Sequence, residues 1–413
     1  MELPTKAREL YPEYRIEYQK ARYNEAYEEF RKLYSETPDY VFSAPGRSEI
    51  CGNHTDHNMG KAVGASIDLD IIAMVKKTDT GRIRLKSKGY DYFDFPFNDT
   101  SLKEGEHGRS ISLIKGIIQY FTDHGYNIGG FDAYTVSDVK KGSGLSSSAA
   151  FEILVSGILN GLYNDNKISP KDLAMASHFA ENVFFCKACG TLDQLSCAYG
   201  GMIAIDFENP ADPKATPVRF DLSKTGYTMV ITDVHADHAD LTADYTAIRR
   251  EMESVAEHFG KKNLRQVSFE EFKNNLPELK AKLPGRAIIR AFHFFNENER
   301  VEKLKAAMSQ NDMSAFLNTV NESGNSSFKY LQNIYPNSNP LNQSLSLALC
   351  LTESILKEDY ACRVHGGGFG GTIQAYMKRE KADSYIKEMN AVFGEGSSFP
   401  LQIRLDGCVM MEI

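Results

Sequence analysis

The chain has 413 residues, of which 42% are hydrophobic and 25% are charged, and it carries a formal net charge of -8 with a sequence pI near 5.8. This composition is typical of a soluble globular protein, and the length suggests two or three domains. The acidic balance argues against nucleic acid as the main partner, and no segment approaches the ~18 consecutive apolar residues that a membrane span needs.

The first predicted element is an amphipathic helix within residues 2–40, where charged residues alternate with tyrosines and no signal-peptide core is present. Seven cysteines without framework spacing indicate reduced thiols and a cytoplasmic location. The apolar patterns then predict strands at 40–43, 61–66, 71–77, 82–87, 131–136 and 202–207, and helices at 111–124, 149–163 and 170–186.

The second half is predicted to open with a strand at 228–233, to continue as helices up to 344–357, and to regain strands at 362–364, 373–378, 401–404 and 409–413. Because helices and strands do not alternate strictly, the pattern favours an α+β fold over a Rossmann sheet. The Pro-containing loop 209–213 is a candidate boundary, so we predict two domains, residues 1–212 and 213–413.

A loop rich in glycine and serine joins the strand at 131–136 to the helix at 149–163. It consists of Gly142, Ser143, Gly144, Leu145, Ser146, Ser147 and Ser148. Glycines let the backbone approach an anion closely, and the first turn of the next helix presents free N–H groups and partial positive charge. The loop is therefore predicted to hold a phosphate, although such runs are also common as plain turns and helix caps.

Two further segments are unusual. Residues 44–60 gather an arginine, histidines, asparagines and an aspartate in what we predict to be one loop, a density of short polar groups typical of sugar recognition. Residues 366–371 contain five glycines in six positions between two strand patterns, which indicates a loop that another group approaches closely.

In this order, residues 44–47 with 52–56, 142–149 and 366–371 resemble the three motifs of the galactokinase branch of the GHMP small-molecule kinase family. Residues 189–194 resemble the segment that holds that family's catalytic aspartate. The resemblance covers essentially the whole chain and implies the two-domain GHMP architecture, with the active site in the cleft between the halves. It also implies an ATP-dependent sugar 1-kinase, a phosphotransferase that would convert galactose and ATP to galactose 1-phosphate and ADP.

The resemblance assigns roles to individual residues. ATP would lie on the loop 142–148, with Mg²⁺ held by the hydroxyl of Ser148 and the carboxylate of Glu181, oxygen ligands of the kind magnesium prefers. Asp193 would accept or orient the proton of the anomeric hydroxyl, and Arg47 would keep Asp193 ionised and stabilise developing negative charge. Taken alone, Asp193 also fits a helix cap, and Arg47 a surface ion pair.

The sugar would contact Asn53, His54, Asp56, Gly190 and Tyr245, of which Tyr245 also fits a core aromatic residue. Members of the family usually have Glu where this chain has Asn53, and Tyr where it has His57. A carboxylate expected to contact the C6 hydroxyl of the sugar is thus replaced by a neutral amide. Because that change removes a negative charge, a hexuronic acid such as galacturonate becomes a credible substrate.

Three functions therefore remain open. The first is a 1-kinase for galactose, the second a 1-kinase for galacturonate or an N-acetylhexosamine, and the third a galactokinase-like sugar sensor without catalytic activity. The sensor is disfavoured because the segment 146–149 is complete and Asp193 is present. The partners expected are the sugar and ATP, with no nucleic acid or membrane; the oligomeric state is open, with a monomer favoured.

Overall fold

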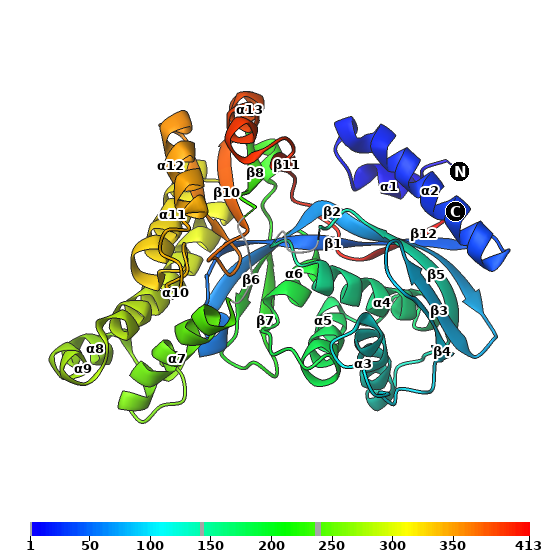
Figure 1. Cartoon of the computed structure of the whole chain (residues 1–413), viewed down its shortest axis with the longest axis horizontal. Helices are drawn as coiled ribbons and strands as arrows, with labels where there is room; N and C mark the ends of the chain where they lie inside the picture. Colours follow the sequence, from blue (N-terminus) through cyan, green and yellow to red (C-terminus); the bar gives the residue numbers. More distant parts are fainter. Residues whose placement is uncertain (1, 141–143, 236–240) are drawn as a thin grey trace.

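The computed structural model describes residues 2–140, 144–235 and 241–413, so Gly142 and Ser143 of the predicted phosphate loop lie outside the described residues. The N-terminal segment forms α1 (Thr5–Glu9), η1 (Glu13–Arg15) and α2 (Ile16–Tyr34) instead of one continuous helix. Pro12 lies between the two α-helices, where its missing N–H and fixed backbone angle interrupt the helical pattern. The amphipathic helix α2 packs Tyr23 and Phe30 against one face of a large sheet (Figure 1).

The large sheet consists of β1 (Tyr40–Cys51), β2 (Lys61–Thr78), β3 (Arg82–Ser87), β4 (Tyr92–Pro96), β5 (Gly130–Ser137), β6 (Met202–Asp206), β7 (Lys214–Val218) and β12 (Val409–Glu412). The strand order is β12-β1-β2-β5-β3-β4, and β6 pairs with the first half of β2 and with β7. β3 and β5 are parallel, whereas the other pairs are antiparallel. The sheet thus brings the two ends of the chain together.

Residues 61–66 and 71–77, predicted as two strands, belong to one strand, β2, so the predicted break between them was wrong. Asp68 and Asp70 resemble a turn signal, yet both are buried within the strand. Asp70 is fully buried and binds Arg22 (Oδ1 to Nη1, 2.7 Å) and Arg404 (Oδ2 to Nη1, 3.2 Å). Because these cations come from distant elements, the sequence pattern could not show that the carboxylate is paired.

The predicted loop 44–60 was also partly wrong, since β1 continues to Cys51 and pairs with β2 through Arg47↔Ser66 and Ser48↔Ala65. Only residues 52–60 form the connection between the two strands. The first motif therefore begins on a rigid strand and ends in a short turn, a placement that fixes the direction of its side chains.

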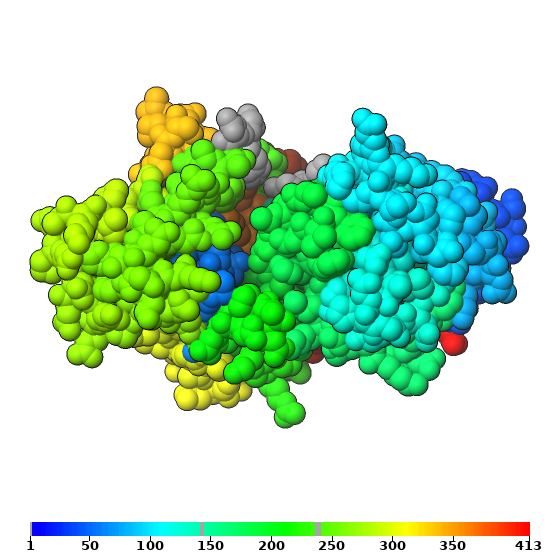
Figure 2. Space-filling model, turned by 90° about the horizontal axis from the view of Figure 1, so that it is seen from below, coloured from blue at the N-terminus to red at the C-terminus, as the bar shows by residue number. Residues whose placement is uncertain are grey.

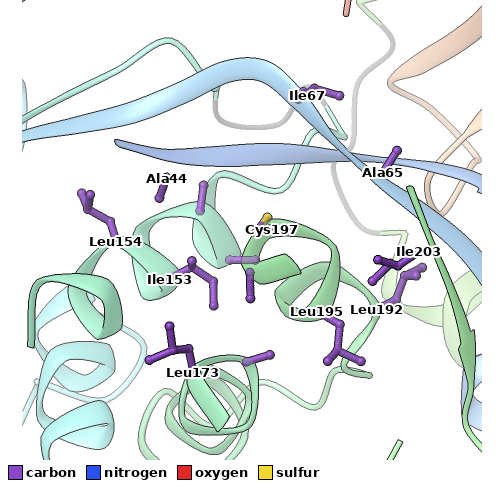
Figure 3. Packing of buried hydrophobic residues seen from close by; sticks show 14 of the residues in the cluster. Ala44, Ala65, Ile67, Ile153, Leu154, Leu173, Leu192, Leu195, Cys197 and Ile203 are labelled. Atoms are coloured by element: carbon purple, nitrogen blue, oxygen red, sulfur yellow. The ribbon is translucent and has the colours of Figure 1, made fainter. Parts of the chain in front are cut away.

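Four helices cover the face of the large sheet opposite α2: α3 (Ser110–Asp123), α4 (Ser147–Tyr163), α5 (Pro170–Phe179) and α6 (Leu192–Tyr199) (Figure 1). The predicted helix 170–186 ends earlier, and the wider turn η3 (Ala180–Phe184) follows α5. Figure 3 shows how side chains from these helices, among them Ile153, Leu154, Leu173 and Leu195, fill the core against strand residues such as Ala44 of β1. This packing holds the N-termini of α4 and α6 at one edge of the sheet.

The rest of the chain builds a second layer. Its sheet has the antiparallel order β11-β8-β10-β9 and consists of β8 (Tyr227–Asp233), β9 (Ala361–His365), β10 (Thr372–Lys378) and β11 (Ser398–Leu401). The helices are α7 (Thr242–His258), α8 (Phe269–Asn274), α9 (Leu276–Lys282), α10 (Gly285–Ser309), α11 (Met313–Ser326), α12 (Ser344–Leu356) and α13 (Ala382–Phe393). Short turns η2 (Asp56–Asn58), η4 (Leu222–Lys224), η5 (Leu264–Gln266), η6 (Ser327–Leu331) and η7 (Arg379–Lys381) complete the elements.

The observed layering confirms the predicted α+β class. β11 lies at Ser398–Leu401 and not at 401–404, and α13 was not predicted. The division at residue 212 falls between β6 and β7, which pair with each other, and β12 returns to the first sheet; the two-domain division stays a prediction. Within the described ranges, every helix is too short or too polar to cross a lipid bilayer.

Candidate active site

The three sequence motifs meet where β1 passes the N-terminus of α4. Gly46 leaves no room for a side chain, because a Cβ there would lie 2.9 Å from the carbonyl oxygen of Leu145. The Arg47 backbone N–H donates to that same oxygen at 3.1 Å. The glycine-rich loop approaches from the other side, where a Cβ on Gly366 would lie 3.7 Å from the carbonyl oxygen of Gly144. The backbones of the three motifs are thus nearly in contact.

Arg47 and Asp193 form a two-point ion pair at this junction. The Arg47 Nε donates to Asp193 Oδ1 at 2.6 Å, and Nη2 donates to Oδ2 at 2.7 Å. Arg47 Nη1 also donates to the carbonyl of Gly144, and the hydroxyl of Ser146 donates to Asp193. Asp193 lies in the first turn of α6, but its side chain is used in this pair and makes no cap hydrogen bond, since the cap residue is Thr191.

The ion pair sets the charge state of both groups. Burial opposes the ionisation of Asp193, but the Arg47 guanidinium outweighs this and lowers the pKa of the carboxyl from its ordinary value. Burial likewise disfavours the charge on Arg47, but the Asp193 carboxylate outweighs this effect. The pKa of the Arg47 guanidinium is therefore raised above its ordinary value. Asp193 is therefore ionised near neutral pH and positioned by a bidentate partner.

Ser148 and Glu181 come together as the resemblance implied. The Ser148 hydroxyl donates to Glu181 Oε1 at 3.4 Å, and Lys187 Nζ donates to the same oxygen at 2.7 Å. Gln194 Nε2 bridges Glu181 Oε2 at 2.8 Å and Glu152 Oε2 at 3.2 Å. Glu152, which the sequence did not single out, is buried, and its Oε1 has no hydrogen-bond partner among the described residues.

These groups fit a divalent cation. Burial, and then the charge of Glu181, raise the pKa of Glu152 well above its ordinary value, so excess negative charge at this point is unfavourable. A hydroxyl and two carboxylates are hard oxygen donors of the kind that Mg²⁺ prefers. The only cation among the described partners of Glu181 is Lys187, whose side chain is 58% exposed and free to move aside.

The turn at residues 52–60 is held by α10. Glu297 accepts from the Gly52 N–H at 2.9 Å, His293 contacts the Asn53 carbonyl at 2.9 Å, and Asn298 accepts from the Lys61 N–H at 2.7 Å. Two adjacent turns of one helix therefore fix the segment that resembles the family's sugar motif.

Four of the predicted sugar-binding residues lie close together: His54 and Asp56 are on this turn, and Gly190 and Tyr245 lie against it. His54 contacts the carbonyl of Gly367 through Nε2 at 2.9 Å, and its ring lies 6.2 Å from that of Tyr245. The Tyr245 hydroxyl donates to the carbonyl of Gly368 at 2.9 Å. A Cβ on Gly190 would lie 2.1 Å from Asp56 Oδ2, so only glycine lets this backbone reach Asp56. Burial raises the pKa of Asp56 and lowers that of His54.

Two connected cavities open here. The larger, of about 770 Å³, is lined by residues that include His54, Asp56, His57, His178, Gly190, Tyr245 and Arg249. The smaller, of about 200 Å³, shares His54, Asp56, Cys189 and Gly190 with it and adds residues that include Arg47, Glu49, Asn53, Asp193 and Gly366. In Figure 2 the surface is hollowed between light-green residues around α7 and green residues around α5 and α6, with blue residues of the first motif at the bottom.

A third cavity, of about 380 Å³, lies on the other side of the serine loop. Ser147 and Ser148 line it together with the aromatic side chains of Tyr90, Phe93, Phe151 and Phe185 and the cationic side chains of Lys88 and Arg109. None of these aromatic or cationic residues was predicted from the sequence, because they come from four separate segments that only the fold brings together.

Comparisons with known proteins agree with this geometry. The family model described as the galactokinase galactose-binding signature matches residues 28–77, and the model for the GHMP kinases N terminal domain matches residues 112–201. A galactokinase of Actinobacillus succinogenes is 30% identical, with 86% of this chain and 89% of that protein covered. A galactokinase of Homo sapiens is also 30% identical, with 94% of this chain and 96% of that protein covered.

Solved structures show the same fold. The crystal structure of Lactococcus lactis galactokinase complexed with galactose has a TM-score of 0.77 at 23% identity, covering 93% of this chain and 98% of that one. A crystal structure of mevalonate kinase has a TM-score of 0.60 at 16% identity, covering 90% of this chain and 99% of that one.

Proposed function

The chain belongs to the galactokinase family of GHMP kinases, and on that premise we propose that it transfers the terminal phosphoryl group of ATP to the anomeric hydroxyl of galactose. The observation that carries the proposal is the ion pair of Arg47 and Asp193, which lines the smaller cavity and also touches the serine loop through Gly144 and Ser146. One pair of side chains thereby lies between the position of an acceptor sugar and the position of a phosphate.

In this proposal Asp193 orients the anomeric hydroxyl and takes its proton. The hydroxyl oxygen attacks the γ-phosphorus of ATP, the bond between that phosphorus and the bridging oxygen breaks, and ADP leaves. In a loose transition state the acceptor keeps its proton until late, so a carboxylate with a lowered pKa is a sufficient base. Arg47 holds Asp193 in its ionised form and places a positive charge beside the transferred group.

The nucleotide is assigned to the serine loop and the third cavity. Free N–H groups at the start of α4 favour phosphate binding, and the aromatic lining of the adjacent cavity suits a planar base. Ser148 and Glu181 are the proposed ligands of Mg²⁺, with Glu152 close by; when bound, this ion neutralises charge on the phosphates. His54, Asp56, Gly190 and Tyr245 are proposed to surround the sugar.

The test is turnover by the purified chain and by Asp193→Asn, measured as ADP release with galactose, glucose, N-acetylgalactosamine and galacturonate. We expect wild-type turnover with galactose and a kcat lowered ~10²-fold or more in the variant, the range that a general base contributes. Thermal unfolding and ATP binding, measured on both proteins, separate lost chemistry from lost folding. Near-wild-type turnover by the folded variant would remove Asp193 from the mechanism, and sugar binding without any turnover by the wild type would support the sensor.

A further inference from the structure

Asn53, where the family usually has a carboxylate, has no hydrogen-bonding capacity left for a ligand. Its Nδ2 donates to Glu49 Oε1 at 2.9 Å and to the carbonyl of Gly366 at 2.8 Å. Its Oδ1 accepts from Asn333 at 2.8 Å and from Ser327 at 3.3 Å. A side-chain amide offers two donor hydrogens and two acceptor lone pairs, and all four are used within the protein.

A carboxylate is nevertheless present at the same cavity, four residues earlier. Glu49 and Arg47 are two residues apart on β1, so their side chains leave the strand on the same face. Both line the cavity of about 200 Å³ with Asp193. Glu49 thus lies beside the proposed catalytic pair, on a strand that the sheet holds rigid.

One oxygen of Glu49 is available to a ligand. Oε1 accepts from Asn53 and lies 3.8 Å from Nη2 of the buried Arg363, whereas Oε2 receives no hydrogen bond from the residues that the structure describes. The residue is only 6% exposed and lines the cavity of about 200 Å³. An acceptor without a protein partner is able to receive a hydrogen bond from a sugar hydroxyl that enters the cavity.

We propose that Glu49, and not Asn53, supplies the carboxylate that hydrogen-bonds a hydroxyl of the sugar; this proposal rests on the proposed function. Glu49 thereby makes the site selective for a neutral hexose over a hexuronic acid. Asn53 acts as a positioning residue that holds Oε1 of Glu49 and the glycine-rich loop in place. The neutral amide at position 53 therefore does not make galacturonate a substrate, because Glu49 supplies the negative charge that Asn53 lacks.

The groups around Glu49 set its pKa, and Glu49 can hydrogen-bond a sugar hydroxyl in either protonation state. Burial is the main influence and raises the pKa of Glu49 to about 7, while Arg363, Asn53 and Arg47 act in the opposite direction and Asp56 adds to the increase. Both protonation states serve a hydroxyl, since the ionised form accepts a hydrogen bond and the neutral form accepts or donates one. A ligand carboxylate would meet like charge from the ionised form of Glu49, which disfavours it by roughly ten- to a hundredfold at a pH above about 7.

The test compares wild type with Glu49→Gln. The readouts are kcat and KM with galactose and with galacturonate, and equilibrium binding of each sugar by calorimetry. We expect KM for galactose to rise roughly tenfold with a smaller change in kcat, and the preference for galactose over galacturonate to fall roughly ten- to a hundredfold. Glu388→Gln, an exposed position on α13, is the matched control and should change neither quantity.

The outcomes separate the two proposals. A wild type that turns over none of the sugars refutes the proposed function, and calorimetry then still tests Glu49 through galactose affinity. An active wild type whose Glu49→Gln variant keeps its KM, affinity and sugar preference refutes the role of Glu49. Wild-type affinity for galacturonate equal to that for galactose refutes the selectivity. Thermal unfolding of the variant controls for misfolding.

Discussion

Glu49→Gln should make the protein more stable at alkaline pH, although it removes a proposed binding residue. In the folded state burial raises the pKa of Glu49 from its ordinary value of 4.5 to about 7. Each pKa unit corresponds to ~1.4 kcal/mol, so ionising Glu49 costs the folded state about 3 kcal/mol relative to the unfolded chain. Glutamine has nearly the same size and never ionises, so the variant avoids this cost.

The sign follows from linkage. A carboxyl whose pKa is raised on folding contributes stability that is fully present below its unfolded pKa and is lost as the pH rises through the folded pKa. For Glu49 that window runs from 4.5 to about 7. As the pH rises across this window, the free energy of unfolding of Glu49→Gln should therefore increase relative to that of the wild type. The full difference of about 3 kcal/mol is reached above the window.

The assay is urea unfolding followed by circular dichroism, because the chain contains no tryptophan. Both proteins are measured at several pH values between about 5 and 8.5, with Glu388→Gln as the exposed control. Two curves that stay parallel within about 0.5 kcal/mol over this range would mean that Glu49 is not a buried, strained carboxylate. The proposed role of Glu49 in sugar selectivity would then lack energetic support, since a residue without such a cost gives no sign of having been retained for function.

Three further perturbations test other parts of the structure. Ser148→Ala and Glu181→Gln should each raise the Mg²⁺ concentration for half-maximal activity, because each removes an oxygen ligand or its charge; unchanged titrations for both would place the ion elsewhere. Gly190→Ala should raise KM for galactose at least ~10-fold and leave KM for ATP unchanged, since its Cβ would lie 2.1 Å from Asp56 Oδ2; equal effects on both substrates would contradict this. Asp70→Ala should destabilise folding by ~3–5 kcal/mol in urea unfolding, because the buried guanidinium groups of Arg22 and Arg404 each lose a carboxylate partner, and a loss below ~1 kcal/mol would contradict it.

The elements and motifs that the sequence predicted well are those with local signals. Alternation along β3 and β5 and the apolar pattern of α3 and α4 gave boundaries within two residues of those observed. The pairing of Arg47 with Asp193, and of Ser148 with Glu181, came from the family resemblance, and the structure records both contacts. No spacing rule alone could have paired residues that lie 146 positions apart.

The features that the sequence missed depend on contacts between distant segments. In the sequence, Glu152 is a single polar position on an apolar helix. Only the fold shows that it contacts Gln194 beside Glu181. The aromatic lining of the third cavity comes from the β4 region, α4 and the end of η3, which carry no common pattern. In each case a side chain gains its role from a neighbour that the linear order does not show.

Asn53 illustrates the same point within one motif. Position 53 departs from the family pattern, and in the sequence alone this departure indicates the loss of a negative charge. The register of β1 against β2 shifts between Glu49 and Cys51, and this irregularity turns the chain so that Glu49 and Asn53 come into hydrogen-bond contact. The other partners of the Asn53 side chain lie 274 to 313 residues away. A substitution at a binding motif is therefore interpretable only with the groups that saturate it: here the amide is fully bonded, and the charge that decides the choice of sugar belongs to Glu49.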